Sequence, residues 1–139
     1  MITTVTLNPM LDKTVVVTDL KHGAIVRASG IAMVVGGKGV NVSRQLCQLG
    51  TETVATGFLG GEIGMMLERM LDGEGIRHRF VRVAGMTREG VTYLDDGGVM
   101  TSVFEPPHAV HADEVERLHE TCDTLAAESS WIVCCGSSP

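Results

Sequence analysis

The sequence predicts an α/β fold, and three observations lead to that prediction. Short runs rich in β-branched residues alternate with segments in which apolar residues recur at helical spacing, a pattern typical of parallel strands joined by crossover helices. Many of the 17 glycines lie at junctions between these segments, where turns are expected. Further extended runs and a hairpin interrupt the alternation, and they would suit a small separate sheet laid over the edge of the main one.

The first strand is expected at residues 2–7, where ITTVTL offers the β-branched residues of a buried strand. Asn8-Pro9 ends this strand, because the pair is typical of a turn. Extended runs follow at 13–17 and at 24–35. The chain then enters a glycine-rich segment, VVGGKGVNVSR, at residues 35–45.

Three helices are predicted, each from apolar residues that share one face at helical spacing. The faces consist of Val42, Leu46 and Leu49 in the first helix, Ile63, Leu67, Met70 and Leu71 in the second, and Val115, Leu118, Cys122 and Leu125 in the third, which runs from about residue 113 to 127. Gly50 follows the first helix and Gly73 the second, and glycine commonly ends a helix.

The remaining strands are short and are expected at residues 53–58, 77–83 and 131–135. A hairpin is predicted from strands at 90–94 and 99–104, because Asp95-Asp96-Gly97-Gly98 supplies favourable turn residues between them. The chain stops four residues after the last strand, in a turn sequence, so we expect it to be the front part of something longer.

Composition and charge disfavour several classes of partner. The formal net charge of −6 argues against nucleic acid and anionic membranes, since both bind basic surfaces. No run approaches the ~18 apolar residues of a membrane span, and the first residues, MITTVTLNPMLDK, do not resemble a signal peptide. The cysteines form no C-x-x-C pair and are expected to be reduced and buried; they are Cys47, Cys122, Cys134 and Cys135. We therefore expect a cytoplasmic protein.

The glycine-rich segment does not match two familiar phosphate-binding patterns. A Walker loop needs glycine at the position of Ala32 and serine or threonine at the position of Gly39. A dinucleotide fingerprint needs glycine at the position of Val42. Two interpretations remain: the glycines form a flexible turn from strand to helix, or they let backbone N–H groups approach a ligand. Asn41 favours the second, because an amide in the first helical turn can contact a ligand or cap the backbone.

Five motifs occur in order along the whole chain: TLNPMLD at 6–12, GGKGVN at 36–41, GFLGG at 57–61, TR at 87–88 and CGSSP at 135–139. Through these motifs the chain resembles the PfkB family of sugar kinases, and it looks most like the 1-phosphofructokinase and tagatose-6-phosphate kinase branch. The resemblance implies a ribokinase-like three-layer α/β/α sandwich with a small β-sheet lid. Residues 1–139 would form the N-terminal portion of one kinase domain, with lid strands at about 13–35 and 88–104 inserted in the α/β core.

The resemblance also implies a set of substrate-binding residues: Asp12, Arg27, Gly36, Gly37, Lys38, Asn41, Arg88 and Ser137. The carboxylate would grip two sugar hydroxyls, the glycines and the amide would contact the sugar, and the cations would face the phosphate already on the substrate, with the serine hydroxyl beside it. From the residues alone, Asp12 could also be a turn residue, the two arginines could be solvated cations, and Ser137 could cap a helix.

By this resemblance, the activity is ATP-dependent phosphorylation of a ketohexose phosphate, foremost of fructose 1-phosphate to fructose 1,6-bisphosphate. The cofactors implied are ATP and Mg²⁺, with sites mostly outside this chain. The alternatives are a tagatose-6-phosphate kinase or other sugar kinase, and a catalytically inactive or truncated sugar-phosphate-binding fragment. The family's GAGD motif, which carries the catalytic base, does not occur here, so no catalytic residue is assigned and the 139 residues alone are expected to be inactive.

The chain departs from the family pattern near the substrate. TR is followed by Glu89-Gly90, where the family often has asparagine, and CGSSP replaces SGSLP, so the identity of the sugar phosphate stays open.

The family further implies a homodimer in which the two lids cover each other. His119 and Cys122 lie three residues apart on the third helix, but their apolar neighbours favour core packing, and no metal site is predicted.

Overall fold

The main sheet is built from the β-branched runs. The computed structural model describes residues 1–139, and four strands form this sheet: β1 (Ile2–Thr6), β4 (Thr53–Gly60), β5 (Val81–Val83) and β8 (Trp131–Cys135). Their order is β5-β4-β1-β8, and every pairing is parallel. β1 is therefore an inner strand, and its residues from Thr3 to Thr6 are buried.

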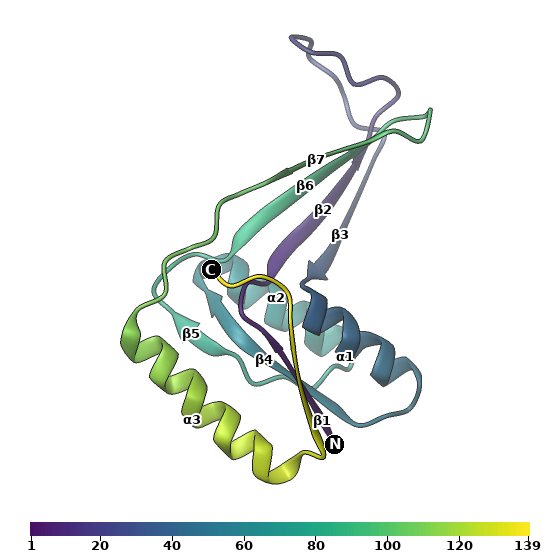
Figure 1. Ribbon diagram of the computed structural model, residues 1–139. Helices are drawn as coiled ribbons and strands as arrows, with labels where there is room; N and C mark the ends of the chain where they lie inside the picture. Colours follow the sequence, from purple (N-terminus) through teal and green to yellow (C-terminus); the bar gives the residue numbers. More distant parts are fainter.

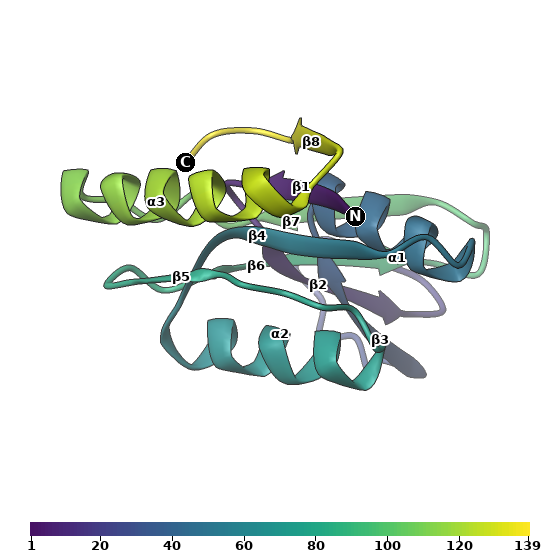
Figure 2. The same ribbon diagram turned by 90° about the horizontal axis from the view of Figure 1, so that it is seen from below.

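Three helices cover the two faces of the main sheet (Figures 1 and 2): α1 (Lys38–Gln48), α2 (Gly61–Gly73) and α3 (Ala112–Glu128). One core cluster joins Val40 of α1 and Leu67 of α2 with Leu59 of β4. A second cluster joins Leu118 of α3 with Phe58, the neighbour of Leu59. Because successive strand residues point to opposite faces, α3 lies on the face opposite α1 and α2. The predicted α/β class with a three-layer core is confirmed.

A second sheet extends away from the main one (Figure 1). It consists of β2 (Met10–Val16), β3 (Gly30–Gly36), β6 (Arg88–Leu94) and β7 (Met100–Phe104), in the order β3-β2-β6-β7. The central pair β2 and β6 is parallel, and the two outer pairings are antiparallel. This sheet leaves several large hydrophobic side chains exposed, namely Ile31, Met33, Val34, Met100, Val103 and Phe104.

Two predicted strands are shorter than expected. The strand expected at 24–35 begins only at Gly30, because the residues before it belong to the loop that joins β2 to β3. The strand expected at 77–83 is regular only from Val81. An isolated bridge between Ala55 and His78 nevertheless continues the pairing beside β4, so the chain runs along the sheet before the strand becomes regular.

The cysteines are less buried than the sequence suggests. All four are free thiols, but Cys47 and Cys134 are exposed, and Cys122 and Cys135 are half-buried. The prediction that they are buried is therefore wrong. β8 is at the edge of the main sheet and is covered on fewer sides than the inner strands, which explains the exposure of Cys134.

A buried carboxylate anchors the first turn of α3. Glu114 is 3% exposed and accepts hydrogen bonds from the backbone amides of His111, at 2.8 Å, and Ala84, at 2.7 Å. Burial raises the pKa of the Glu114 carboxyl, but these hydrogen bonds outweigh it and hold the pKa below its usual value. The contact ties α3 to the segment that leads from β5 to Arg88.

None of the three helices combines the length and the apolar character that crossing a membrane requires.

Candidate substrate-binding pocket

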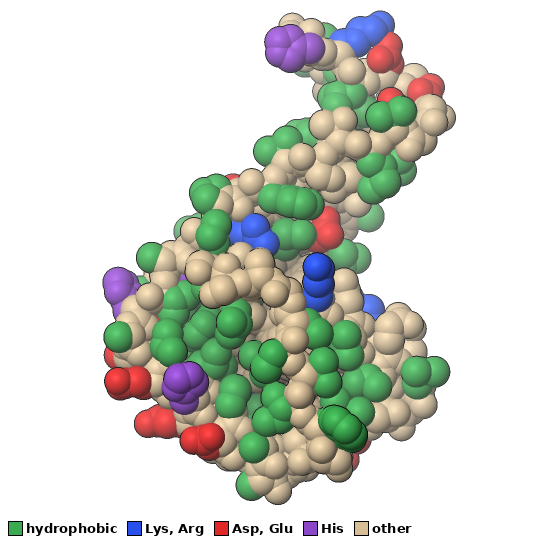
Figure 3. All heavy atoms as spheres, viewed as in Figure 1, with side chains coloured by type: hydrophobic (Ala, Val, Ile, Leu, Met, Phe, Trp, Pro, Cys, Tyr) green, Lys and Arg blue, Asp and Glu red, His purple; other side chains and the backbone are tan.

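A polar pocket of about 260 Å³ lies where the second sheet meets the main sheet, beyond the carboxyl ends of β1 and β8. In open α/β sheets, ligands bind beyond the carboxyl ends of the strands. Ten residues line the pocket: Thr6, Asn8, Met10, Asp12, Gly37, Lys38, Asn41, Arg88, Gly136 and Ser137. Figure 3 shows basic side chains gathered at the junction of the two sheets. The structure thus brings six of the eight residues that the sequence singled out to one place.

Glycines bring the start of α1 against the end of β1. Gly37 has a φ of +133°, a conformation that favours glycine, and a Cβ there would lie 2.7 Å from Cγ2 of Thr6. A Cβ at Gly39 would lie 2.4 Å from Oγ1 of Thr6, and the same hydroxyl accepts a 3.0 Å hydrogen bond from the amide of Val40. No side chain caps the helix. The two glycines therefore serve close backbone packing, and they leave the positive end of α1 beside the pocket.

Asn41 does not cap this helix, so of the two roles that its amide could have, contact with a ligand or capping, the structure excludes capping. α1 begins at Lys38, and the backbone amide of Asn41 already donates a helical hydrogen bond to the carbonyl of Gly37, at 2.9 Å. The side-chain oxygen Oδ1 accepts a 2.6 Å hydrogen bond from Nη1 of Arg44, which is itself paired with Glu74. Arg44 therefore fixes the orientation of the Asn41 amide, and the side-chain Nδ2 has no protein partner.

One carboxylate and two cations share the pocket without pairing to one another. No ion pair within the chain includes Asp12, Lys38 or Arg88. The Arg88 side chain donates through Nη1 to the carbonyl of Glu105, at 3.2 Å, while its Nε is buried without a partner. Buried polar atoms normally have hydrogen-bond partners, so an unpaired guanidinium nitrogen in a pocket favours a ligand there.

Asn8 is a pocket residue that the sequence analysis missed. It is 7% exposed, and its Nδ2 donates to Oγ of Ser137, at 3.4 Å, while its Oδ1 is buried without a partner. This contact joins the end of β1 to the segment after β8. The signal was present in TLNPMLD, but Asn8-Pro9 was interpreted only as a strand break. Thr6, Met10 and Gly136 were missed as well.

Two predicted site residues do not line the pocket. Gly36 ends β3, and a Cβ there would lie 3.1 Å from both Cβ of Asp12 and Cγ of Met10, so it adjoins the pocket residues without lining the cavity. Arg27 is exposed in the loop between β2 and β3, at the end of the second sheet remote from the pocket (Figure 1).

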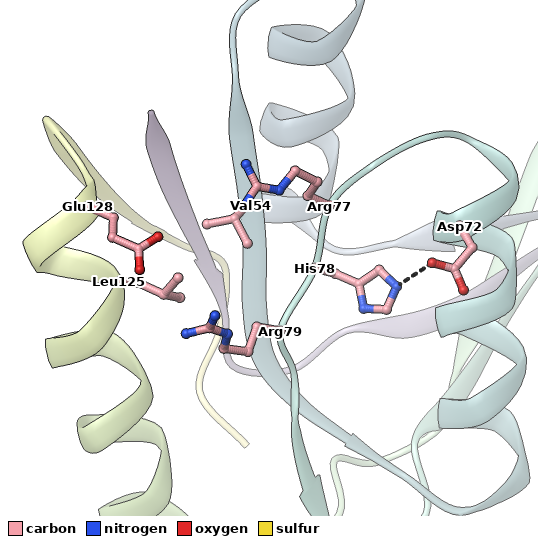
Figure 4. Close-up of a pocket in the computed structure, with 7 residues that line it drawn as sticks. All are labelled: Val54, Asp72, Arg77, His78, Arg79, Leu125 and Glu128. Atoms are coloured by element: carbon pink, nitrogen blue, oxygen red, sulfur yellow. Dashed lines mark hydrogen bonds and ion pairs between the residues drawn. The ribbon is translucent and has the colours of Figure 1, made fainter.

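A second hollow, of about 300 Å³, lies near the amino ends of β4 and β5 (Figure 4). Its charged groups are partly neutralised within the chain, because His78 contacts Asp72 at 3.1 Å and Arg77 pairs with Glu52. Arg79 and Glu128 also line it and carry opposite charges. With its charges balanced and its position at the opposite ends of the strands, this hollow is the weaker candidate for a substrate site.

Comparisons with known proteins agree on one family. The sequence pattern of the pfkB family carbohydrate kinases matches residues 5–137 of this chain. The 1-phosphofructokinase of Vibrio cholerae serotype O1 is 32% identical over 138 residues, which are 99% of this chain and 44% of that protein. A Thermotoga maritima crystal structure described as "Possible 1-phosphofructokinase" is 34% identical with a TM-score of 0.92, covering 100% of this chain and 45% of its own.

The phosphofructokinase-2 of Escherichia coli has been solved in complex with fructose-6-phosphate. It is 28% identical, with a TM-score of 0.90, and the match covers 99% of this chain and 46% of that enzyme. The same enzyme has also been solved in a tetrameric inhibited form. This chain therefore spans less than half the length of each of these relatives.

Proposed function

The chain belongs to the pfkB family of carbohydrate kinases, and we propose that its pocket binds a ketohexose phosphate, foremost fructose 1-phosphate, for phosphorylation to fructose 1,6-bisphosphate. The observation that carries the proposal is the unpaired set of charges in the pocket, where one carboxylate faces the same cavity as two cations. A sugar phosphate offers the matching groups, namely hydroxyls that donate to a carboxylate and a phosphate that pairs with cations.

Six of the ten pocket residues have a role in this proposal. Asp12 accepts hydrogen bonds from two sugar hydroxyls, and Lys38 and Arg88 hold the phosphate that the substrate already carries. The side-chain Nδ2 of Asn41 donates to the sugar, since its Oδ1 is occupied by Arg44. The hydroxyl of Ser137, which accepts a hydrogen bond from Nδ2 of Asn8, lies beside the substrate phosphate in this proposal. The residues together bind and orient the substrate, which is one of the parts that phosphoryl transfer requires of a protein.

Membership of a kinase family implies ATP as phosphoryl donor, and Mg²⁺ would neutralise charge on its phosphates. Residues 1–139 do not fit a metal site, because no group of three or more His, Cys, Asp or Glu side chains is arranged to hold an ion. Asp12 is the only carboxylate that lines the pocket, and it is assigned to the sugar. We therefore propose that the nucleotide and metal sites lie mostly outside these residues.

Residues 1–139 alone are expected to show no turnover in a coupled ATPase assay with fructose 1-phosphate and Mg²⁺. Phosphoryl transfer needs a base at the attacking hydroxyl and donors at the transferred group, and positioned groups of this kind supply most of the rate. The family resemblance assigns both to the GAGD motif, which does not occur in residues 1–139. Turnover above background that disappears in an Asp12→Ala variant would show that the catalytic machinery lies within these residues after all.

Substrate preference is tested in a kinase chain that contains these residues. Fructose 1-phosphate, fructose 6-phosphate and tagatose 6-phosphate are compared by kcat/KM, and the highest value is expected for fructose 1-phosphate. A higher value for tagatose 6-phosphate would favour the alternative sugar kinase. A kinase that phosphorylates none of the three sugar phosphates would overturn the proposed function.

We further propose that two copies associate through the second sheet, because its exposed hydrophobic side chains would otherwise face water. Val103, 61% exposed on β7, is the test position. Val103→Lys is expected to shift the mass measured by light scattering from dimer toward monomer at micromolar concentration, since the lysine would have to be buried. Leu49→Lys, 78% exposed at the end of α1, serves as the control and should leave the dimer intact. A monomer mass for the unsubstituted kinase would contradict the proposal.

A further inference from the structure

Met10 is the one hydrophobic side chain among the ten that line the substrate pocket. It is the first residue of β2, and it is half-buried. In the second sheet it pairs with Gly36 of β3 on one side and with Arg88 of β6 on the other. An apolar side chain therefore lies in the middle of an otherwise polar site, directly beside a cation assigned to the substrate phosphate.

Two glycines on neighbouring strands make the space in which this side chain lies. A Cβ at Gly36 would be 3.1 Å from Cγ of Met10, and a Cβ at Gly90 would be 3.0 Å from its Sδ. The Met10 side chain thus runs from beside β3 to beside β6, over β2. Phe104 closes the far end, because its Cδ1 would lie only 2.6 Å from a Cβ at Gly90. The thioether occupies the volume that side chains at both glycine positions would fill.

A thioether changes what this part of the pocket can recognise. It has no hydrogen-bond donor and is only a weak acceptor, whereas an amide or hydroxyl in the same place would bind a sugar hydroxyl. A hydroxyl pressed against it would lose its hydrogen bonds to water without replacement, while a C–H face would lose nothing. The neighbouring Asp12 and Asn41 supply polar contacts. The side of the pocket that Met10 forms therefore disfavours hydroxyls, whereas the sides formed by polar residues accept them.

We propose that Met10, lying across Gly36 and Gly90, is a specificity-determining residue that selects sugar phosphates whose ring carbon beside the thioether presents a C–H bond and not a hydroxyl. This inference rests on the proposed function, because it assumes that the pocket takes a ketohexose phosphate.

The test uses an active kinase chain that contains residues 1–139, with four substrates. These are the 1-phosphates of fructose and of its three epimers, allulose at C3, tagatose at C4 and sorbose at C5. In the furanose ring, which leaves the 6-hydroxyl free, the C3 and C4 epimers each turn one ring hydroxyl to the other face, and the C5 epimer turns the CH2OH arm instead. One of the C3 and C4 epimers should therefore present a hydroxyl to Met10. Met10→Gln, which has similar length and adds an amide, is expected to relax discrimination against that one epimer by about tenfold or more, because a hydroxyl is then hydrogen-bonded.

Three further variants make the result specific. Met10→Leu keeps an apolar side chain and should preserve the order of the four kcat/KM values. Met10→Ala opens room for water beside the hydroxyl and should relax discrimination against the same epimer as Met10→Gln does. Met65→Gln makes the same chemical change on α2, where the side chain is 40% exposed and remote from the pocket, and should change no ratio.

The outcomes separate the two claims. Unchanged epimer ratios in both Met10→Gln and Met10→Ala, in a kinase that still phosphorylates fructose 1-phosphate, would overturn the role of Met10 and leave the proposed function standing. An unsubstituted kinase that phosphorylates none of the four compounds would overturn the proposed function and this inference together. Relaxation against all three epimers alike would also count against Met10, because it indicates a generally loosened site.

Discussion

Replacing Asp12 with alanine is expected to lower kcat/KM for the sugar phosphate by about 30-fold or more, through a higher KM and a lower kcat. The carboxylate lines the pocket and has no ion-pair partner within the chain, so its hydrogen-bonding capacity is available to the substrate. Loss of a charge-assisted contact costs about 2 kcal/mol, which corresponds to that factor in rate. Steady-state kinetics on an active kinase chain that contains these residues gives both constants.

Two variants control this measurement. Asp12→Asn keeps the shape and one acceptor oxygen, so it should fall between the alanine variant and the unsubstituted protein. Asp96→Ala removes an exposed carboxylate in the hairpin turn between β6 and β7 and should leave kcat/KM unchanged. If Asp12→Ala left kcat/KM unchanged, Asp12 would not belong to the site.

Gly57→Ala is expected to destabilise the fold by at least about 3 kcal/mol, the sum of a backbone clash and an unfavourable backbone conformation. Gly57 has a φ of +142°, and a Cβ there would lie 1.8 Å from the carbonyl oxygen of Thr6, its partner in the pairing of β1 with β4. No rotation of a side chain relieves this contact, because the atom that it meets is backbone. The two central strands must move apart, and Thr6 lines the pocket.

The effect is measured by equilibrium unfolding in urea. The Gly57→Ala variant should reach its unfolding midpoint at a lower urea concentration than the unsubstituted protein. Gly73→Ala is the matched control, because Gly73 is the last residue of α2 and a Cβ there meets nothing within 4 Å. That change should leave stability equal or raise it, since alanine favours helix over glycine. A Gly57→Ala variant as stable as Gly73→Ala would show that the two strands adapt without cost.

Periodicity was enough to predict the elements that lie within short windows of sequence. The helices around Val42, Leu67 and Leu118 and the hairpin expected at 90–94 and 99–104 follow from local patterns, and all occur. The start of α1 could not be obtained in this way. It depends on how closely Gly37 and Gly39 approach Thr6, a residue more than 30 positions earlier, and no local pattern contains that contact.

The pocket shows the same limit. Asp12, Lys38 and Arg88 could be singled out because they lie in or beside the motifs that carry the resemblance to the sugar kinases, and the structure brings them to one cavity. Asn8 could not, because its role depends on a hydrogen bond to Ser137, 129 residues away. Met10 looked like an ordinary apolar residue of a strand. Only the positions of Gly36 and Gly90 on the neighbouring strands show what space it fills.

The first strand gains its second neighbour late when the protein is made on a ribosome. Ile2 of β1 pairs with Thr53 of β4 on one side and with Trp131 of β8 on the other, so β1 waits for β8. At typical synthesis rates, roughly ten seconds or more separate the two. Throughout that interval one edge of β1 can pair with another nascent chain. Slower growth at low temperature or an abundance of chaperones should therefore raise the yield of folded protein.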